Sequence, residues 1–318
     1  MERTARREAD RDPKFGNWNL ADALVALGRS DVAVREVIAR LLDALPPEEA
    51  SIRKGLFEAS LAALQGRFDV TLARLDEADR ASASSPAHRD ELDGFAPAAA
   101  QRIKTLLEIG DERGARDVAG ALVDRLDVAR QTSRVLGDDG VYLWVLRAAG
   151  VPLDPARRDW VSAALASATP RGAVWLFAWA NPATTRADAE DALSALGGKD
   201  GLELPRGAEN MMSVAAGDGP AGNVLLLAGR ATEAIPFLRR ASASCLLPLE
   251  APFELIHARL ELATALERTG DTEGACAVYG ELIERLGHAT PRSVSAEEAR
   301  VAAARLRCGR ARDAGGGG

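Results

Sequence analysis

The sequence predicts an all-α protein, an α-solenoid of about six to seven antiparallel helical hairpins ending in a C-terminal capping helix. Three observations predict this fold class. One spacing of small and large apolar residues around a central glycine occurs twice in succession toward the C-terminus. Glycines with partial copies of the same spacing recur through the first half of the chain. Aromatic residues make up only 4% of the 318 residues while alanine is abundant, which suits closely packed helices better than a β-sandwich core.

The two clearest copies lie within residues 221–286. Both place matching residue types at offsets −7, −4, 0, +5, +9 and +12 from the central glycine. The first copy consists of Gly222, Leu225, Gly229, Ala234, Leu238 and Ala241, and the second of Ala263, Leu266, Gly270, Ala275, Tyr279 and Leu282. Residues three or four apart share one helix face, and glycine ends a helix in the left-handed conformation without a Cβ clash. Each copy is therefore expected to be two helices joined at the glycine.

Four earlier glycines extend the pattern toward the N-terminus. Gly28, Gly66, Gly110 and Gly150 are 38, 44 and 40 residues apart, longer than the roughly 34 residues of a minimal helical repeat. Ile103 departs from the small residue expected at −7, and the copy around Gly150 is the weakest because prolines precede its second helix.

The domain organisation follows from these repeats. Residues 1–16 form a charged lead-in, 17–309 the solenoid with an irregular centre at about 150–220, and 310–318 a flexible glycine-rich tail. We expect a polar connector at 81–97, and a long loop with a short helix at 199–220. A final helix follows residue 291, with Ser293 or Ser295 as its N-cap.

The repeat spacing is typical of tetratricopeptide (TPR) repeats. The segments LLLAGRATEAIPFLRRASASC, LELATALERTGDTEGACAVYGELIERLG and TPRSVSAEEARVAAARLRC resemble the C-terminal TPR regions of large bacterial eukaryote-like serine/threonine kinases. AVWLFAWANPATTRADAEDALSAL resembles the segment that precedes them. The resemblance covers roughly residues 140–310 and implies a sensing or docking role beside a kinase. The sequence has no glycine-rich phosphate loop, catalytic loop or metal-binding motif of a kinase, so phosphotransfer is not implied.

Composition narrows the class of partner. The formal net charge of −7 argues against general binding to nucleic acid or to an anionic membrane surface. Residues 1–14 lack the apolar core of a signal peptide, and the longest apolar stretch, 172–185, is too short to span a bilayer. Cys245, Cys276 and Cys308 are 31 and 32 residues apart, which signals neither a zinc site nor a disulfide framework. We therefore expect buried free thiols in a cytoplasmic protein.

The sequence carries no catalytic signature. His88, His257 and His288 are scattered, and no metal-ligand cluster or nucleophile motif accompanies them. We predict no enzymatic activity, no cofactor and no metal. Four tryptophans (Trp144, Trp160, Trp175 and Trp179) crowd the centre, where core packing is favoured over a recognition pocket.

The predicted function is a non-catalytic protein–protein interaction scaffold that holds a partner peptide or helix in its concave groove. First helices line that surface in a solenoid, and the positions expected to face inward are Trp18, Asp22, Arg53, Lys104, Arg147, His257 and Arg268. The set does not reproduce the Lys/Asn carboxylate clamp of chaperone-binding TPR proteins. The alternative is a regulatory or sensor module of a bacterial serine/threonine kinase system, with the kinase or its substrate as partner. A third hypothesis is an enzyme with a pocket within 144–212.

Overall fold

A computed structural model of the chain describes residues 31–43, 45–84, 92–132, 142–166, 170–198, 211–244 and 252–308, with single positions 6, 20, 21, 24, 202 and 204. Helices account for nearly all of this part, and no strand occurs in it beyond two isolated bridges. Its helices are α3 (Asp31–Asp43), α4 (Pro47–Leu64), α5 (Phe68–Ser84), α6 (Leu92–Glu108), α7 (Glu112–Thr132), α8 (Tyr142–Ala148), α9 (Asp154–Ala166), α10 (Arg171–Trp175), the π-helix η1 (Leu176–Ala180), α11 (Arg186–Ala195), α12 (Met211–Leu227), α13 (Ala231–Ser242), α14 (Pro252–Arg268), α15 (Thr272–Leu286) and α16 (Val294–Leu306).

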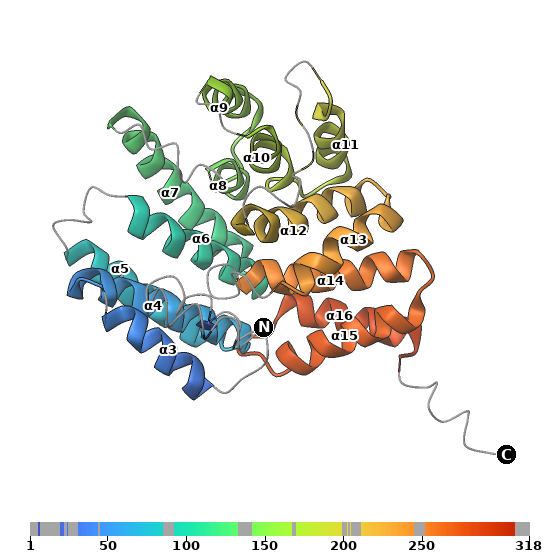
Figure 1. Cartoon of the computed structure of the whole chain (residues 1–318), viewed down its shortest axis with the longest axis horizontal. Helices are drawn as coiled ribbons and strands as arrows, with labels where there is room; N and C mark the ends of the chain where they lie inside the picture. The colour runs from blue at the N-terminus through green and yellow to red at the C-terminus, as the bar shows by residue number, and fades with distance from the viewer. Residues whose placement is uncertain are drawn as a thin grey trace.

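Helices that follow one another in the sequence pack as neighbours (Figure 1). Such neighbours include α4 with α5, α12 with α13 and α13 with α14. The all-α prediction is confirmed for the described residues, and the order of packing is that of an α-solenoid. Alanine supplies much of the core, as at Ala59, Ala234 and Ala263, which are fully buried. Small side chains at these positions let the helix axes approach closely.

Five of the predicted glycine turns have one geometry. Gly66, Gly110, Gly150, Gly229 and Gly270 all have positive φ, between 69° and 85°. In each turn the glycine N–H donates to the carbonyl at −3, and the next N–H donates to the carbonyl at −4. This pair of bonds is the Schellman motif, which satisfies carbonyls that the helix end leaves free. The predicted helix ends are confirmed at these five positions, and Gly28 lies outside the described residues.

The second helix of two hairpins starts at once because an aspartate follows the glycine. Asp111 and Asp271 each accept a hydrogen bond at 2.9 Å, from the N–H of Gly114 and Gly274 respectively. These carboxylates cap the N-termini of α7 and α15. Their shared sequence, Gly-Asp-x-x-Gly-Ala, fixes a short turn and an antiparallel neighbour.

The array curls until its two ends meet. Helix α14 packs against α4, and α16 packs against α6 (Figure 1). Phe68 stacks on Phe253 with ring centroids 6.2 Å apart, and the Thr290 N–H donates to the Gly66 carbonyl at 2.8 Å. A Cβ at Gly66 would lie 2.9 Å from the Ala289 Cβ, so this glycine also permits close approach. We call this contact between α4/α6 and the segment from α14 to α16 the seam.

The centre of the chain differs from the long loop with a short helix that the sequence predicts at 199–220. Helix α12 starts at Met211 and runs through Pro220, so the prediction of a long loop is wrong for 211–220. Pro220 removes one backbone donor, but tertiary packing compensates: Ala221 and Val224 are fully buried, and Asp218 accepts two hydrogen bonds from Arg240 at 2.7 and 2.9 Å. The connector predicted at 81–97 is also shorter, because α5 continues to Ser84 and α6 begins at Leu92.

Two of the central tryptophans are core residues, as predicted. Trp175 is fully buried and donates to the Ala192 carbonyl at 2.7 Å, and Trp160 is 3% exposed with an edge-to-face contact to Phe177. Trp144 and Trp179 are half-buried. Ser293, one of the two predicted caps, is the N-cap of α16 and accepts from the Ala296 N–H at 2.9 Å.

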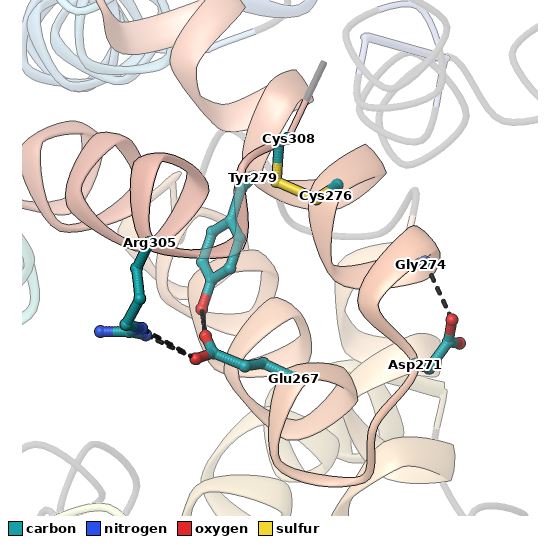
Figure 2. Close-up of a disulfide and its surroundings, with 7 residues drawn as sticks. All are labelled: Glu267, Asp271, Gly274, Cys276, Tyr279, Arg305 and Cys308. Atoms are coloured by element: carbon teal, nitrogen blue, oxygen red, sulfur yellow. Dashed lines mark hydrogen bonds and ion pairs between the residues drawn. A yellow bond between two sulfur atoms is a disulfide. The ribbon is translucent and has the colours of Figure 1, made fainter. Parts of the chain in front are cut away.

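The expectation of free thiols is wrong for two of the three cysteines. Cys276 of α15 and Cys308, two residues past the end of α16, form a disulfide with Cα atoms 5.4 Å apart (Figure 2). Cys245 lies outside the described residues. None of the described helices is long and apolar enough to cross a bilayer.

The glycine turns make a direct stability prediction. Gly270 has a φ of +85°, and the position that a Cβ would occupy is open, so Gly270→Ala tests conformation without a clash. We expect the substitution to lower the free energy of unfolding by about 1 kcal/mol, because a left-handed conformation is costly for alanine. Urea denaturation would measure it.

The matched control is Gly280→Ala, in the middle of α15 and also with open space around it. Here alanine should stabilise by up to about 1 kcal/mol, since glycine is the poorer helix former. Equal effects of the two substitutions would contradict the left-handed turn at Gly270.

Candidate functional site at the seam

The sequence-predicted groove residues fall into three groups. Trp18 and Asp22 lie outside the described residues. Arg53 is exposed on α4 and forms an ion pair at 3.6 Å with Glu49 one helical turn away. The other four residues contact distant parts of the chain, and two of those four meet at the seam.

Arg147 and Arg268 are bound to backbone carbonyls. Arg147 of α8 donates from Nε to the Pro182 carbonyl at 3.2 Å and forms an ion pair with Asp188. Arg268 donates from Nη1 to the Leu226 carbonyl at 2.9 Å. Because Leu226 lies in the last turn of α12, the cation also faces the negative end of that helix dipole. Both arginines therefore fasten adjacent repeats together.

Lys104 of α6 reaches across the seam. Its ammonium forms an ion pair with Glu254 of α14 and lies 5.2 Å from the centre of the Trp144 ring. The second carboxylate oxygen of Glu254, Oε2, is buried without a hydrogen-bond partner. Burial alone would raise the pKa of Glu254, but the charge and hydrogen bond of Lys104 lower it below its ordinary value.

Glu108, one turn further along α6, is the most completely engaged acid of the seam. Glu108 is only 3% exposed to solvent. It accepts hydrogen bonds from the hydroxyls of Ser293 at 2.5 Å and Ser295 at 2.8 Å, and from the N–H of Ser295 at 3.2 Å. His257 Nε2 of α14 lies 3.5 Å from the same carboxylate. A buried carboxylate needs such donors because an unpaired one would cost several kcal/mol.

Two pKa shifts follow from this arrangement. Burial alone would raise the pKa of Glu108, but the hydrogen bonds and charge of His257, with the two serines, bring it below its ordinary value. Burial alone would lower the pKa of His257, but Glu108, together with Glu261 and Glu254, raises it. Each partner thus favours the charged form of the other.

Glu261, a second acid of α14, has a pKa that is shifted in the opposite direction from those of Glu254 and Glu108. Burial raises the pKa of Glu261 to about 7, with only a partial offset from His257. Glu254, His257 and Glu261 are spaced by three and four residues, so they form one row along the helix. The side chains of Glu254 and His257 remain 38% and 46% exposed beside the buried Glu108. We call Glu254, His257 and Glu261 the inner row.

The chemistry available to this site is ionic and hydrogen-bonding. Within the described residues, no group of three or more His, Cys, Asp or Glu side chains could hold a metal ion. The seam instead pairs a lysine and a histidine with two carboxylates across elements about 150 residues apart. Such a set can recognise charged side chains or change its hydrogen bonding with pH.

Sequence reasoning missed Glu108, Glu254, Glu261 and the pairing of the serines. One signal was available for Glu108, which is two residues before Gly110 and so occupies an inward-facing position of its repeat. The partners of Glu108 gave no such signal, since Ser293 is 185 residues away.

Three comparisons with known proteins were negative. No family model matches the chain, and searches of curated proteins and of solved structures find no significant match.

The first prediction for the site concerns Glu108→Gln. The amide cannot accept from both serines and pair with His257 as the carboxylate does, so we expect the free energy of unfolding to fall by about 2 to 4 kcal/mol. Urea denaturation at pH 6 would measure this loss. Glu284→Gln, at an exposed position of α15, is the matched control and should change stability by less than about 0.5 kcal/mol. A Glu108→Gln protein as stable as the control would refute the role of this carboxylate in closing the seam.

The second prediction concerns pH. A group whose folded pKa is raised stabilises the fold at low pH and loses that contribution as the pH rises through the folded pKa. Both His257 and Glu261 are of this kind. Glu108 and Glu254 have lowered pKa values, so their contributions are already complete above about pH 5. Stability should therefore decrease between pH 6 and pH 8, by about 1 kcal/mol from Glu261 alone.

Chemical denaturation of the wild type and of Glu261→Gln at pH 6, 7 and 8 would test this. The variant should lose the part of the decline that Glu261 contributes, because glutamine does not titrate, and should keep the part that His257 contributes. A wild-type stability that rises over this range would contradict the assignment.

Proposed function

We propose that this chain is a non-catalytic protein–protein interaction scaffold of the TPR class, which binds a partner peptide or helix on its inner face. The observation that carries the proposal is the inner row of α14. Its Glu254 and His257 side chains meet residues of α6 and stay partly exposed, whereas apolar residues hold the helices together. Partly exposed polar groups on a rigid support suit recognition of another chain.

The repeated turns support the same proposal. Five Schellman turns with φ between 69° and 85° end α4, α6, α8, α12 and α14 in the same way. Side chains at one position of each repeat are thereby presented side by side, as peptide recognition by a solenoid requires. We place this role in the cytoplasm.

The contacts at the seam limit the ways in which a partner can bind. Lys104 and His257, two of the predicted contact residues, are already paired with Glu254 and Glu108. A partner therefore either binds through Glu261, the member of the inner row outside these two pairs, or replaces these internal contacts. Binding by the second route is weaker, because part of the binding free energy is used to open the seam.

The test is partner capture by the immobilised full chain from native lysate, quantified by mass spectrometry. Three proteins are compared: the wild type, an inner-face variant with Trp18→Ala, Arg53→Glu and Glu261→Gln, and the outer-face control Arg116→Glu. Arg116 is exposed on α7, a second helix. A partner retained by wild type and control, but reduced at least about tenfold by the inner-face variant, is the expected result.

Loss of the partner in the outer-face control, or capture by none of the three proteins, would count against the proposal. Thermal melting of each protein excludes unfolding as the cause. The alternative role, a regulatory or sensor module of a serine/threonine kinase system, gains support if the captured partner carries a kinase domain or is phosphorylated by one.

A further inference from the structure

Helix α16 is fastened at both ends, to different parts of the array. At its start, Ser293 and Ser295 donate hydrogen bonds to Glu108 of α6, across the seam. Past its end, Arg307 adopts the left-handed conformation with φ of 58° and directs the chain back, so that Cys308 bonds to Cys276 of α15 (Figure 2). The helix therefore links the disulfide to the seam.

Most of the apolar contacts of α16 are made by small side chains, and Leu306 at its end packs partly buried against the main core cluster. The buried residues of α16 are small: Ser295, Ala296, Ala299 and Ala302. Two apolar side chains of α16, Val294 and Val301, are exposed, Val301 by 57%. Small side chains bury little apolar area, so they give the helix limited free energy of docking.

The polar contacts near the C-terminal end are also modest. Arg305 pairs with Glu267 at 2.6 Å, and Tyr279 donates to the same carboxylate at 3.1 Å (Figure 2). Arg305 is 61% exposed, and exposed ion pairs contribute little to stability. The disulfide is thus the strongest single link between α16 and the helix beneath it.

We propose that Cys276–Cys308 is a redox-sensitive latch that controls whether α16 holds the seam closed. In the oxidised chain, α16 is fixed on α15 and its serines are held against Glu108. Reduction frees the C-terminal end of α16, and the whole helix then dissociates more often from α15 and α6. Without the serine donors, the buried carboxylate of Glu108 keeps only His257, and the seam opens more readily. This inference concerns closure of the array and holds whichever partner the inner face binds.

The step requires a thiol reductant, and a dithiol supplies both of the thiols that it consumes. One thiolate of the dithiol attacks a cystine sulfur, forms a mixed disulfide and displaces the other cysteine as a thiolate. The second thiol of the reductant then displaces the remaining cysteine. Two electrons and two protons pass to the protein, which ends with two thiols, while the dithiol becomes a disulfide. Cys276 and Cys308 are only half-buried, so both residues lie near the surface. In reducing compartments, disulfides of this kind are commonly transient or redox-sensing.

The experiment uses the full chain with Cys245→Ser, which removes the third thiol and leaves the proposed latch intact. Alkylation after denaturation should add no label to the oxidised protein and two labels after treatment with dithiothreitol. Amide hydrogen exchange followed by mass spectrometry then compares the two states. We expect exchange in residues 294–306 to become at least about tenfold faster on reduction, with a smaller increase in residues 104–111 of the seam. Reoxidation should restore the slow exchange.

The matched control is Cys245→Ser with Cys276→Ser and Cys308→Ser. It should exchange like the reduced protein and should not respond to dithiothreitol. Two labels on the protein before reduction would show that the disulfide does not form and would overturn the proposal. So would exchange in α16 that is unchanged on reduction, or faster exchange confined to residues 303–308 without any change at the seam. Exchange that rises equally in every helix would also overturn it, because the disulfide would then stabilise the whole fold and not act as a latch.

Discussion

The carboxylate of Glu108 sets the constraint on which the closed form of the array depends. A charged group that is 3% exposed is tolerated only where donors replace the water it has lost. The donors that bind it come from the other end of the chain, through Ser293, Ser295 and His257. If α6 and the segment from α14 to α16 separate, the acid is hydrated again and the donors are released together. Loss of some of these donors therefore weakens the contacts that remain at the seam.

The sequence predicted those features of the fold that depend on neighbouring residues. A Schellman turn is determined by a glycine and the helix before it, so Gly66, Gly110, Gly150, Gly229 and Gly270 could be assigned without a structure. Pro220 shows the limit of this reasoning. The tetrad Gly-Asp-Gly-Pro indicates a turn locally, but burial of Ala221 and Val224 and the Asp218–Arg240 pair hold it in a helix. Tertiary packing outweighed local propensity there.

The candidate site was only partly predictable, for a related reason. Spacing placed Lys104 and His257 on inward-facing positions, but it could not show that they would find acids on the opposite end of the array. Those pairs depend on how far the solenoid curls, which accumulates from small rotations between repeats. The disulfide escaped prediction similarly. A separation of 32 residues is about one repeat, and contact between Cys276 and Cys308 depends on the left-handed Arg307, a non-glycine residue.

Closure of the array and recognition of a partner draw on the same side chains. The inner row contributes Glu254 and His257 to the seam, and burial dominates the environment of its third member, Glu261. A cationic group that reached Glu261 would favour its charged form and lower its pKa from about 7. A group that competed for Glu108 would first have to displace two serine hydroxyls and a histidine. Binding at the first position is therefore compatible with the closed array, whereas binding at the second requires an open one. The affinity measured for a partner that uses the second position would then depend on the fraction of open molecules, and so on whatever fixes α16 in place.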